Sequence, residues 1–194
     1  MIKVGLTGGI GSGKSVIATL FRLMDIPVYI ADEESKRLTV TSPVIRQQLT
    51  HQFGREVYTP EGLNKPFLAQ KIFTDPDNLE IVNGIIHPEV AKDYIHWTQN
   101  QHSDLCVIEA AILFESGFDQ FVDHTVMVYT PLQTRIKRII QRDHSNREDI
   151  LRRIENQLPD EIKKERSDYV IYNDDLKALI PQTEKLLNQI RFTK

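Results

Sequence analysis

A glycine-rich loop near the first residues of the chain constrains the fold more strongly than any other feature. The segment Gly8-Gly9-Ile10-Gly11-Ser12-Gly13-Lys14-Ser15 fits the pattern G-x-x-x-x-G-K-[S/T] at every position. A mostly apolar run at residues 2–7 precedes the loop and predicts a buried strand. Apolar residues three or four positions apart follow it over residues 16–24 and predict a helix. Because strand, loop and helix occur in the order that phosphate binding requires, a chance glycine-rich turn is the weaker interpretation.

The residue types in this loop match the chemistry of a nucleotide triphosphate. Glycines allow main-chain N–H groups to approach phosphates, and a helix starting at Lys14 presents its positive end to them. The Lys14 ammonium can bridge the β- and γ-phosphates, and the Ser15 hydroxyl can ligate Mg²⁺. The nucleotide-binding residues predicted in this segment are Gly9, Gly11, Ser12, Gly13, Lys14, Ser15 and Val16.

Four further apolar runs predict strands, and they cover residues 27–32, 105–110, 125–130 and 169–172. Helical patterns separate the runs, most clearly at residues 132–142 and 176–190. Strands that alternate with helices pair in parallel through right-handed crossovers and are covered on both faces. We therefore predict an α/β fold of the P-loop NTPase type, with three α/β/α layers and a five-stranded parallel sheet.

The interval between the second and third predicted strands, about seventy residues, is far longer than a crossover needs. Within it, residues 32–50 and 63–96 are mostly helical in pattern. We expect residues 32–100 to form a helical insertion that binds the acceptor substrate. The expected core comprises residues 1–31, 101–134 and 168–194, and residues 135–167 are expected to form a mobile lid.

The loop by itself does not distinguish a kinase from a GTPase switch or a mechanical ATPase. A GTPase needs a guanine-reading Asn-Lys-x-Asp motif, but Asn64-Lys65 is followed by Pro66-Phe67, so the aspartate is missing. Motors and helicases usually need longer chains than 194 residues. A small-molecule kinase needs an acceptor pocket, a base and mobile cations, and the chain offers candidates for all three.

Two carboxylates follow predicted strands, at the sheet edge where open α/β folds bind ligands. Asp32 follows the second strand and could accept the proton of an attacking hydroxyl, although it could equally cap a helix that starts at Glu33. Glu109 lies at the end of the third strand and could hold Mg²⁺, or it could be a solvated strand end. Position in the sequence leaves both pairs of interpretations open.

Arg135, Arg138 and Arg142 are spaced i, i+3 and i+7, which places them on one face of a helix. Such a face could clamp phosphates from a closing lid. The alternative is an ordinary solvated charged face, because carboxylates that could neutralise the arginines are close in the sequence. Those carboxylates are Glu148, Asp149, Glu155 and Glu165.

Net charge and composition indicate which kinds of partner and which cellular compartment to expect. The net charge of −3 argues against a nucleic-acid-binding surface, which is usually basic. No apolar run approaches the length of about 18 residues that a membrane span requires. The only cysteine, Cys106, cannot form an internal disulfide, and the early loop leaves no room for a signal peptide. We therefore expect a cytoplasmic protein, either a monomer or a weak homo-oligomer, without nucleic-acid or membrane partners.

Segments spread along the chain follow the pattern of one known family. They are residues 6–15, Ala31-Asp32, Phe53-Gly54, Gly62-Leu63, Leu79-Glu80 with His87-Pro88, Ile112-Leu113-Phe114-Glu115, Arg138 with Arg142-Asp143, Arg153-Ile154 with Gln157, and residues 168–173. The order and spacing of these segments are more specific than any one of them beyond the loop. In them the chain resembles the dephospho-CoA kinase family over almost its whole length.

The resemblance implies a reaction and a set of roles. The reaction would convert ATP and dephospho-CoA into ADP and coenzyme A with Mg²⁺, and Asp32 would act as the base for the ribose 3′-hydroxyl. Arg142 would contact the ATP phosphates or stack near the base, and Asn173 would lie beside the adenine. Together with the loop and strand-end positions described above, the expected catalytic residues are Asp32, Lys14 and Arg142, and Ser15 and Glu109 are expected at the metal. The residues expected to bind the acceptor are Asp32, Lys36, Lys65, His87, Leu113 and Glu115.

Several positions depart from the family pattern. Ile30 and Ala111 replace a common aspartate and a common proline. Lys36 and Lys65 stand where arginine is frequent, which keeps the charge but loses the two-pronged hydrogen bond. His87 could instead be a helix-start histidine before proline that orders the insertion. The rival functions are another small-molecule or nucleoside monophosphate kinase and a nucleotide-binding regulatory protein without transferase activity.

Overall fold

The computed structural model describes residues 1–75, 77–143 and 146–192, and it divides into two compact units. The first, called the core unit, comprises Met1–Ile30 and Gln101–Lys194. The second, called the insertion unit, comprises Ala31–Asn100. Each unit is described by itself below.

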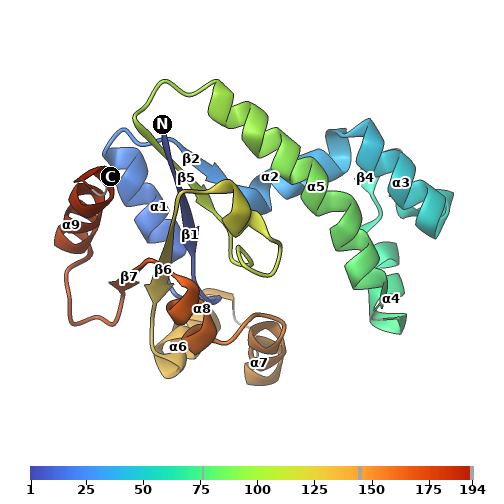
Figure 1. Cartoon of the computed structure of the whole chain (residues 1–194). Coiled ribbons are helices and arrows are strands. Elements are labelled where there is room, and N and C mark those ends of the chain that lie inside the picture. The colour runs from blue at the N-terminus through green and yellow to red at the C-terminus, as the bar shows by residue number, and fades with distance from the viewer. Residues whose placement is uncertain (76, 144–145, 193–194) are drawn as a thin grey trace. The chain divides into compact units, whose positions relative to one another are not determined.

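The predicted five-stranded parallel sheet is confirmed in the core unit, with strand order β2-β5-β1-β6-β7 (Figure 1). The strands are β1 (Ile2–Thr7), β2 (Val28–Ile30), β5 (Leu105–Glu109), β6 (His124–Tyr129) and β7 (Tyr169–Tyr172). In this register Glu109 pairs with Leu6 of β1 on one side and with Ile30 of β2 on the other. Because all five strands are parallel, their carboxyl ends meet at one edge of the sheet, where the phosphate loop leaves β1.

Helices and one irregular segment cover the sheet. The core-unit helices are α1 (Lys14–Leu23), α6 (Leu132–Asp143), α7 (Arg147–Glu155), α8 (Asp160–Arg166) and α9 (Leu179–Phe192), and the 3₁₀ helix is η2 (Phe118–Phe121). Alternate β1 residues face opposite ways, so Val4 and Leu6 share a buried cluster with residues of α1 and α9. Gly5 faces the other side, against Leu113 and Val122.

The insertion unit consists mainly of helices, with one element that the sequence pattern did not show. Its helices are α2 (Ala31–Thr41), α3 (Pro43–Phe53), α4 (Lys65–Thr74) and α5 (Asp77–Gln99), with the short 3₁₀ helix η1 (Arg55–Val57). The additional element is an antiparallel hairpin of β3 (Tyr58–Thr59) and β4 (Gly62–Leu63), joined by Pro60 and Glu61. Arg37 of α2 donates two hydrogen bonds to Asp93 of α5, both 2.8 Å long, and so ties the ends of the insertion together.

The prediction that His87 could start a helix is wrong. Helix α5 runs without a break from Asp77 to Gln99 and contains Pro88. Proline inside a helix removes one hydrogen bond and crowds the carbonyl of the residue four positions earlier. That residue is Gly84, where the helix surface is open, since a Cβ built on it would meet nothing within 4 Å. Packing of α5 against α2, α3 and α4 offsets the missing hydrogen bond.

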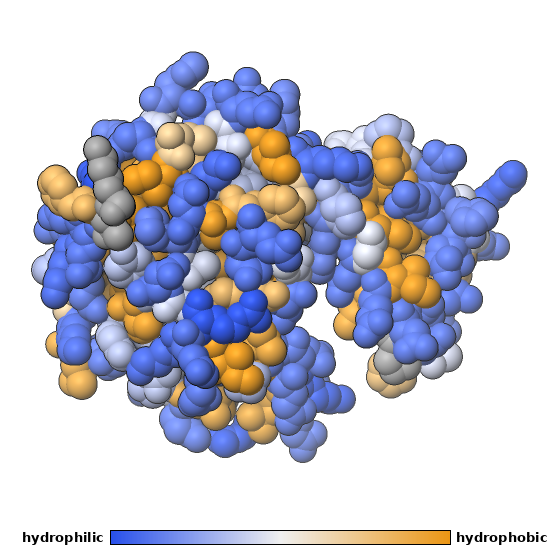
Figure 2. All heavy atoms as spheres, in the orientation of Figure 1, coloured by the Kyte–Doolittle hydropathy of each residue, from blue (hydrophilic) through white to orange (hydrophobic). Residues whose placement is uncertain are grey.

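The visible face is mostly hydrophilic, with apolar residues interspersed (Figure 2). In the part of the chain that the structure describes, no helix combines the length and the apolar character that crossing a membrane would require.

Candidate active site

The glycine-rich loop forms a tight turn between β1 and α1. Gly8, Gly11 and Gly13 have φ angles of 147°, 80° and 90°, in the region that L side chains rarely adopt. The Lys14 ammonium donates to the Gly8 carbonyl at 3.0 Å, so its side chain folds back over the start of the loop. The first main-chain N–H groups of a helix generally have no carbonyl partner in the preceding turn and can receive an anion. In α1 the Val16 N–H donates to the Gly13 carbonyl at 3.0 Å.

Three loop glycines also make room for side chains of other segments. A Cβ at Gly9 would overlap the Arg135 guanidinium, and one at Gly13 would overlap the Asn173 side-chain amide. A Cβ at Gly11 would come within 2.8 Å of the Ile139 side chain. The sequence suggested only the close approach of phosphates as the reason for these glycines, whereas α6 and the residue after β7 also require them.

A lysine and a glutamate face each other at the base of the loop. Lys14 Nζ lies 3.8 Å from Glu109 Oε1, and both side chains are about 10% exposed. Glu109 is the last residue of β5, so it stands at the sheet edge and is not a solvated strand end. Ser15 and Val16 lie in the first turn of α1 and are exposed. A nearly buried ammonium beside a carboxylate is a suitable environment for a phosphate group and its metal ion.

Asp32 lies in the first turn of α2 and is exposed. The strand predicted at residues 27–32 ends at Ile30, because Asp32, Glu33 and Glu34 favour the positive end of a helix. Since α2 starts at Ala31, Asp32 is not the residue that caps a helix starting at Glu33. Along the chain it is two residues beyond Ile30, whose partner in the sheet is Glu109.

The far side of the loop is held by polar groups that follow β6 and β7. Asn173 Nδ2 donates to the Ser12 carbonyl at 2.8 Å, and Thr130 Oγ1 lies 2.9 Å from the same oxygen. Arg138 donates to Asp175 at 2.7 Å and lies 3.4 Å from Asn173 Oδ1. Asn173, which was expected beside the adenine, therefore ties the end of β7 to the loop.

The arginine row on α6 is neither a uniform lid face nor a uniformly solvated one. Arg135 is 3% exposed and pairs with Asp160 at 2.6 Å. Arg142 is at the other end of the row, and its side chain is 62% exposed. Its Nε pairs with Asp143 Oδ1, also at 2.6 Å. Hydrogen bonding to Arg142 lowers the pKa of Asp143 to about 2. The first turn of the row is therefore buried against the loop, and of these three arginines Arg142 has the most accessible guanidinium.

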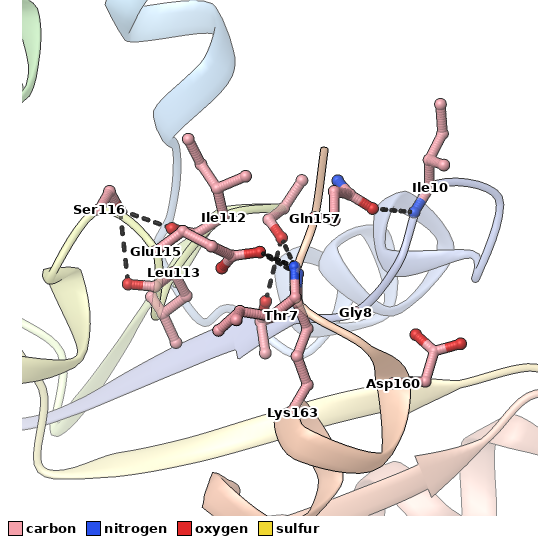
Figure 3. A network of polar contacts seen from close by, with 12 residues as sticks. Thr7, Gly8, Ile10, Ile112, Leu113, Glu115, Ser116, Gln157, Asp160 and Lys163 are labelled. Atoms are coloured by element: carbon pink, nitrogen blue, oxygen red, sulfur yellow. Dashed lines mark hydrogen bonds and ion pairs between the residues drawn. The ribbon is translucent and has the colours of Figure 1, made fainter. Parts of the chain in front are cut away.

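The segment that follows β5 is connected to the chain after α7 by a buried lysine (Figure 3). Lys163 has no exposed surface, and its Nζ donates to the Ala111 carbonyl at 2.7 Å and to Glu115 Oε1 at 2.8 Å. Glu115 Oε1 also accepts from the Leu158 N–H at 2.8 Å. Glu115 thus binds other segments of the protein, namely Lys163 and the main chain at Leu158. Leu113 is fully buried under Gly5, so any effect on the acceptor has to be indirect.

We predict that Lys163→Met lowers the free energy of unfolding by about 1–3 kcal/mol, because it leaves the Ala111 carbonyl and the Glu115 carboxylate without their buried donor. Urea unfolding would measure this change. Adding Glu115→Gln should recover part of the loss, since a neutral amide is less costly than a carboxylate to leave without its charged partner. Arg191→Ala breaks an exposed pair with Asp104 and should cost less than about 1 kcal/mol. A loss of similar size in Lys163→Met and Arg191→Ala would contradict the structural role of Lys163.

The acceptor candidates of the insertion unit differ in exposure. Lys36 of α2 and Lys65 of α4 are exposed and available to an anionic ligand. His87 is partly buried in α5, and burial lowers the pKa of its imidazole below the usual 6.5. Burial therefore favours the neutral form of His87 in the ligand-free protein, and a neutral imidazole can contribute a hydrogen bond to an acceptor.

Curated relatives and a family model match this chain over most of its length. The family model described as dephospho-CoA kinase matches residues 2–178. A dephospho-CoA kinase of Bacteroides fragilis is 48% identical over 187 residues, covering 96% of this chain and 91% of the relative. One of Porphyromonas gingivalis is 42% identical over 192 residues, covering 98% of this chain and 95% of the relative.

Solved structures show the same architecture. The Thermus thermophilus protein TT1252 has a TM-score of 0.80 and 29% identity, covering 100% of this chain and 98% of that protein. The dephospho-CoA kinase of Campylobacter jejuni has a TM-score of 0.70 and 21% identity, covering 97% of this chain and 96% of that protein. At that identity the second likeness supports the fold alone.

Proposed function

The chain belongs to the dephospho-CoA kinase family, and we propose that Lys14, Asp32 and Arg142 carry out the reaction of that family. The reaction is the ATP-dependent phosphorylation of the ribose 3′-hydroxyl of dephospho-CoA, the final step of coenzyme A synthesis. The enzyme is a kinase, so the predicted kinase class is confirmed and the GTPase and motor alternatives are set aside.

The observation that best supports the role of Lys14 is its position in the loop. Lys14 is 9% exposed, and its ammonium donates to the Gly8 carbonyl and lies beside Glu109. A positive charge that is already desolvated and held in place stabilises charge developing on the transferred phosphoryl group without reorganising during the reaction. Lys14 and the loop N–H groups would therefore bind the phosphates and stabilise the transition state.

Asp32 is proposed to orient the acceptor hydroxyl and to accept its proton. The side chain is exposed and directly follows the strand next to β5, whose last residue is Glu109. A carboxylate used as a base must be reachable by the substrate, and the exposure of Asp32 meets this condition.

Arg142 is proposed to bind the nucleotide phosphates when the lid closes. Its present partner, Asp143, is on the surface, and exposed ion pairs contribute little to stability. Exchange of Asp143 for a more highly charged phosphate would therefore cost little. A closed lid would also exclude water that competes with the acceptor.

We propose that Mg²⁺ is held by the Ser15 hydroxyl and the Glu109 carboxylate at the same edge of the sheet. Among the residues that the structure describes, no three His, Cys, Asp or Glu side chains are grouped to hold a metal ion. Oxygen atoms of the nucleotide would therefore have to complete the ligand set. Mg²⁺ bound there would share the negative charge of the phosphates.

The insertion unit is proposed to bind the acceptor, with Lys36, Lys65 and His87 as candidate contacts. Two exposed ammonium groups suit an acceptor that carries a diphosphate. The neutral imidazole of His87 would add a hydrogen bond.

The function is tested by an ADP-release assay with ATP, with and without Mg²⁺, across dephospho-CoA, AMP, CMP and shikimate. We expect turnover with dephospho-CoA to exceed that with each other acceptor by at least about tenfold, since groups in the acceptor site would otherwise stay unpaired. A preference for another acceptor would favour a different small-molecule kinase. Tight ATP binding without any phosphorylated product would favour a regulatory protein. Full turnover without divalent cations would contradict the Mg²⁺ proposal.

A further inference from the structure

The middle of the phosphate loop is held from outside by three side chains, and we propose that these side chains act as a clamp that preorganises the loop for the nucleotide. The clamp consists of Arg135 of α6, Gln157 of the turn after α7, and Asp160 at the start of α8. All of them belong to the core unit. The inference rests on the proposed nucleotide site and adds positioning residues to it.

Gln157 and Arg135 bind both polar groups of one loop residue. The Ile10 N–H donates to Gln157 Oε1 at 3.0 Å, and the Ile10 carbonyl lies 3.5 Å from Arg135 Nη1. The Ile10 side chain packs on the buried cluster of Ile136, Ile139 and Ile150. Main chain and side chain of Ile10 are therefore both anchored to the helices that follow β6.

Arg135 itself is held firmly over the neighbouring residue, Gly9. Its Nη2 pairs with Asp160 at 2.6 Å, and its side chain is 3% exposed. A Cβ on Gly9 would overlap Arg135 Nη1 and come within 3.0 Å of Asp160 Oδ1. Gly9 is not among the residues with positive φ, so packing against the clamp, and not backbone conformation, requires glycine there.

The clamp contains a buried N–H group that makes no hydrogen bond and so does not stabilise the fold. Within the described residues, Arg135 Nε is buried without an acceptor, and so is the Ser12 hydroxyl on the other side of the loop. Buried polar groups without partners are unfavourable and persist where other contacts hold them in place. The position of Arg135 is thus set by its packing against Gly9, although this position leaves one of its own N–H groups without a hydrogen bond.

A clamped loop binds nucleotide more tightly than a mobile one. When the competent conformation is populated only a tenth of the time, the apparent dissociation constant rises tenfold. The chemical step depends on Lys14 and Asp32, which the clamp does not touch. Loss of the clamp should therefore weaken ATP binding selectively, with little change in kcat.

The test uses Gln157→Leu and Arg135→Ala in the full chain, with circular dichroism to confirm folding and calorimetry to measure ATP binding. We expect the Kd for ATP to rise about tenfold in each variant, with kcat and the KM for dephospho-CoA within about twofold of the wild type. Arg191→Ala, which breaks an ion pair beside the amino end of β5, is the control and should leave the Kd unchanged. Unchanged ATP binding in folded Gln157→Leu, or a loss of kcat at unchanged Kd, would overturn the clamp.

A double-mutant cycle with Gly9→Ala tests the contact directly. Gly9→Ala should weaken ATP binding in the wild type by displacing Arg135, and it should add less than about twofold to the loss in Arg135→Ala. Additive losses would show that Gly9 is required for another reason, and they would overturn the proposal. If the wild type binds ATP but phosphorylates a different acceptor, the proposed function is wrong. The double-mutant cycle still tests the clamp in that case, because it measures only ATP binding.

Discussion

Replacing Lys14 by methionine is expected to lower kcat by about 10²- to 10³-fold, which corresponds to about 3–4 kcal/mol of lost transition-state stabilisation. Methionine keeps most of the length and apolar volume of the side chain and removes only the ammonium. That ammonium is nearly buried between the Gly8 carbonyl and Glu109, so solvent cannot replace its charge efficiently. The loss should therefore exceed that expected for an exposed lysine.

Steady-state kinetics with saturating dephospho-CoA and varied ATP would measure this effect. Lys185→Met is the matched control, because Lys185 is exposed on α9, away from the loop, and its loss should leave kcat within about twofold. Normal turnover in Lys14→Met would remove Lys14 from the catalytic residues, whatever the affinity for ATP.

Replacing Asp32 by asparagine is expected to lower kcat by about 10²- to 10⁴-fold, the usual contribution of a general base. Asparagine keeps the size and hydrogen-bonding capacity of the side chain but cannot accept the proton of the acceptor hydroxyl. ATP binding should change little, because the phosphates are held by the loop and Lys14. This separates Asp32 from Lys14, whose loss should also weaken ATP binding.

Glu33→Gln is the matched control for Asp32. Glu33 is the next residue, is exposed, and lies in the same first turn of α2, where acidic side chains stabilise the helix end. If Asp32 acts only through the helix end, the two variants should lose similar, small amounts of activity. Equal kcat values in Asp32→Asn, Glu33→Gln and the wild type would disprove the assignment of the base.

The fold was largely predictable because its signals are local in the sequence. β1 and β7 have the predicted bounds, since each is a short apolar run between clear turn or helix signals. The helix predicted at residues 132–142 is observed as α6, with one more residue. The second strand was predicted too long, because the helix-promoting run Asp32-Glu33-Glu34 outweighs the apolar pattern before it.

The site was only partly predictable. Lys163 stands in the highly charged run of α8, Asp160–Arg166, which is typical of a solvated helix, yet it is the buried partner of Glu115. Arg135 was grouped with Arg142 by helical spacing, but spacing alone does not show what packs against each turn. The role of Gln157 on Ile10 had no local signal, since the two residues are 147 positions apart.

The sequence by itself determined the strand, glycine loop and helix, the presence of a helical insertion and the kinase family, because these depend on neighbouring residues and on the order of motifs. Tertiary structure alone decided which charged side chains are buried and what they hold. Burial of Arg135 and Lys163 arises from segments far apart in the chain, with Asp160 and Gly9 around the first and Ala111 and Glu115 around the second. The free energy of burying a charge depends on such partners, and no local pattern of residues specifies them.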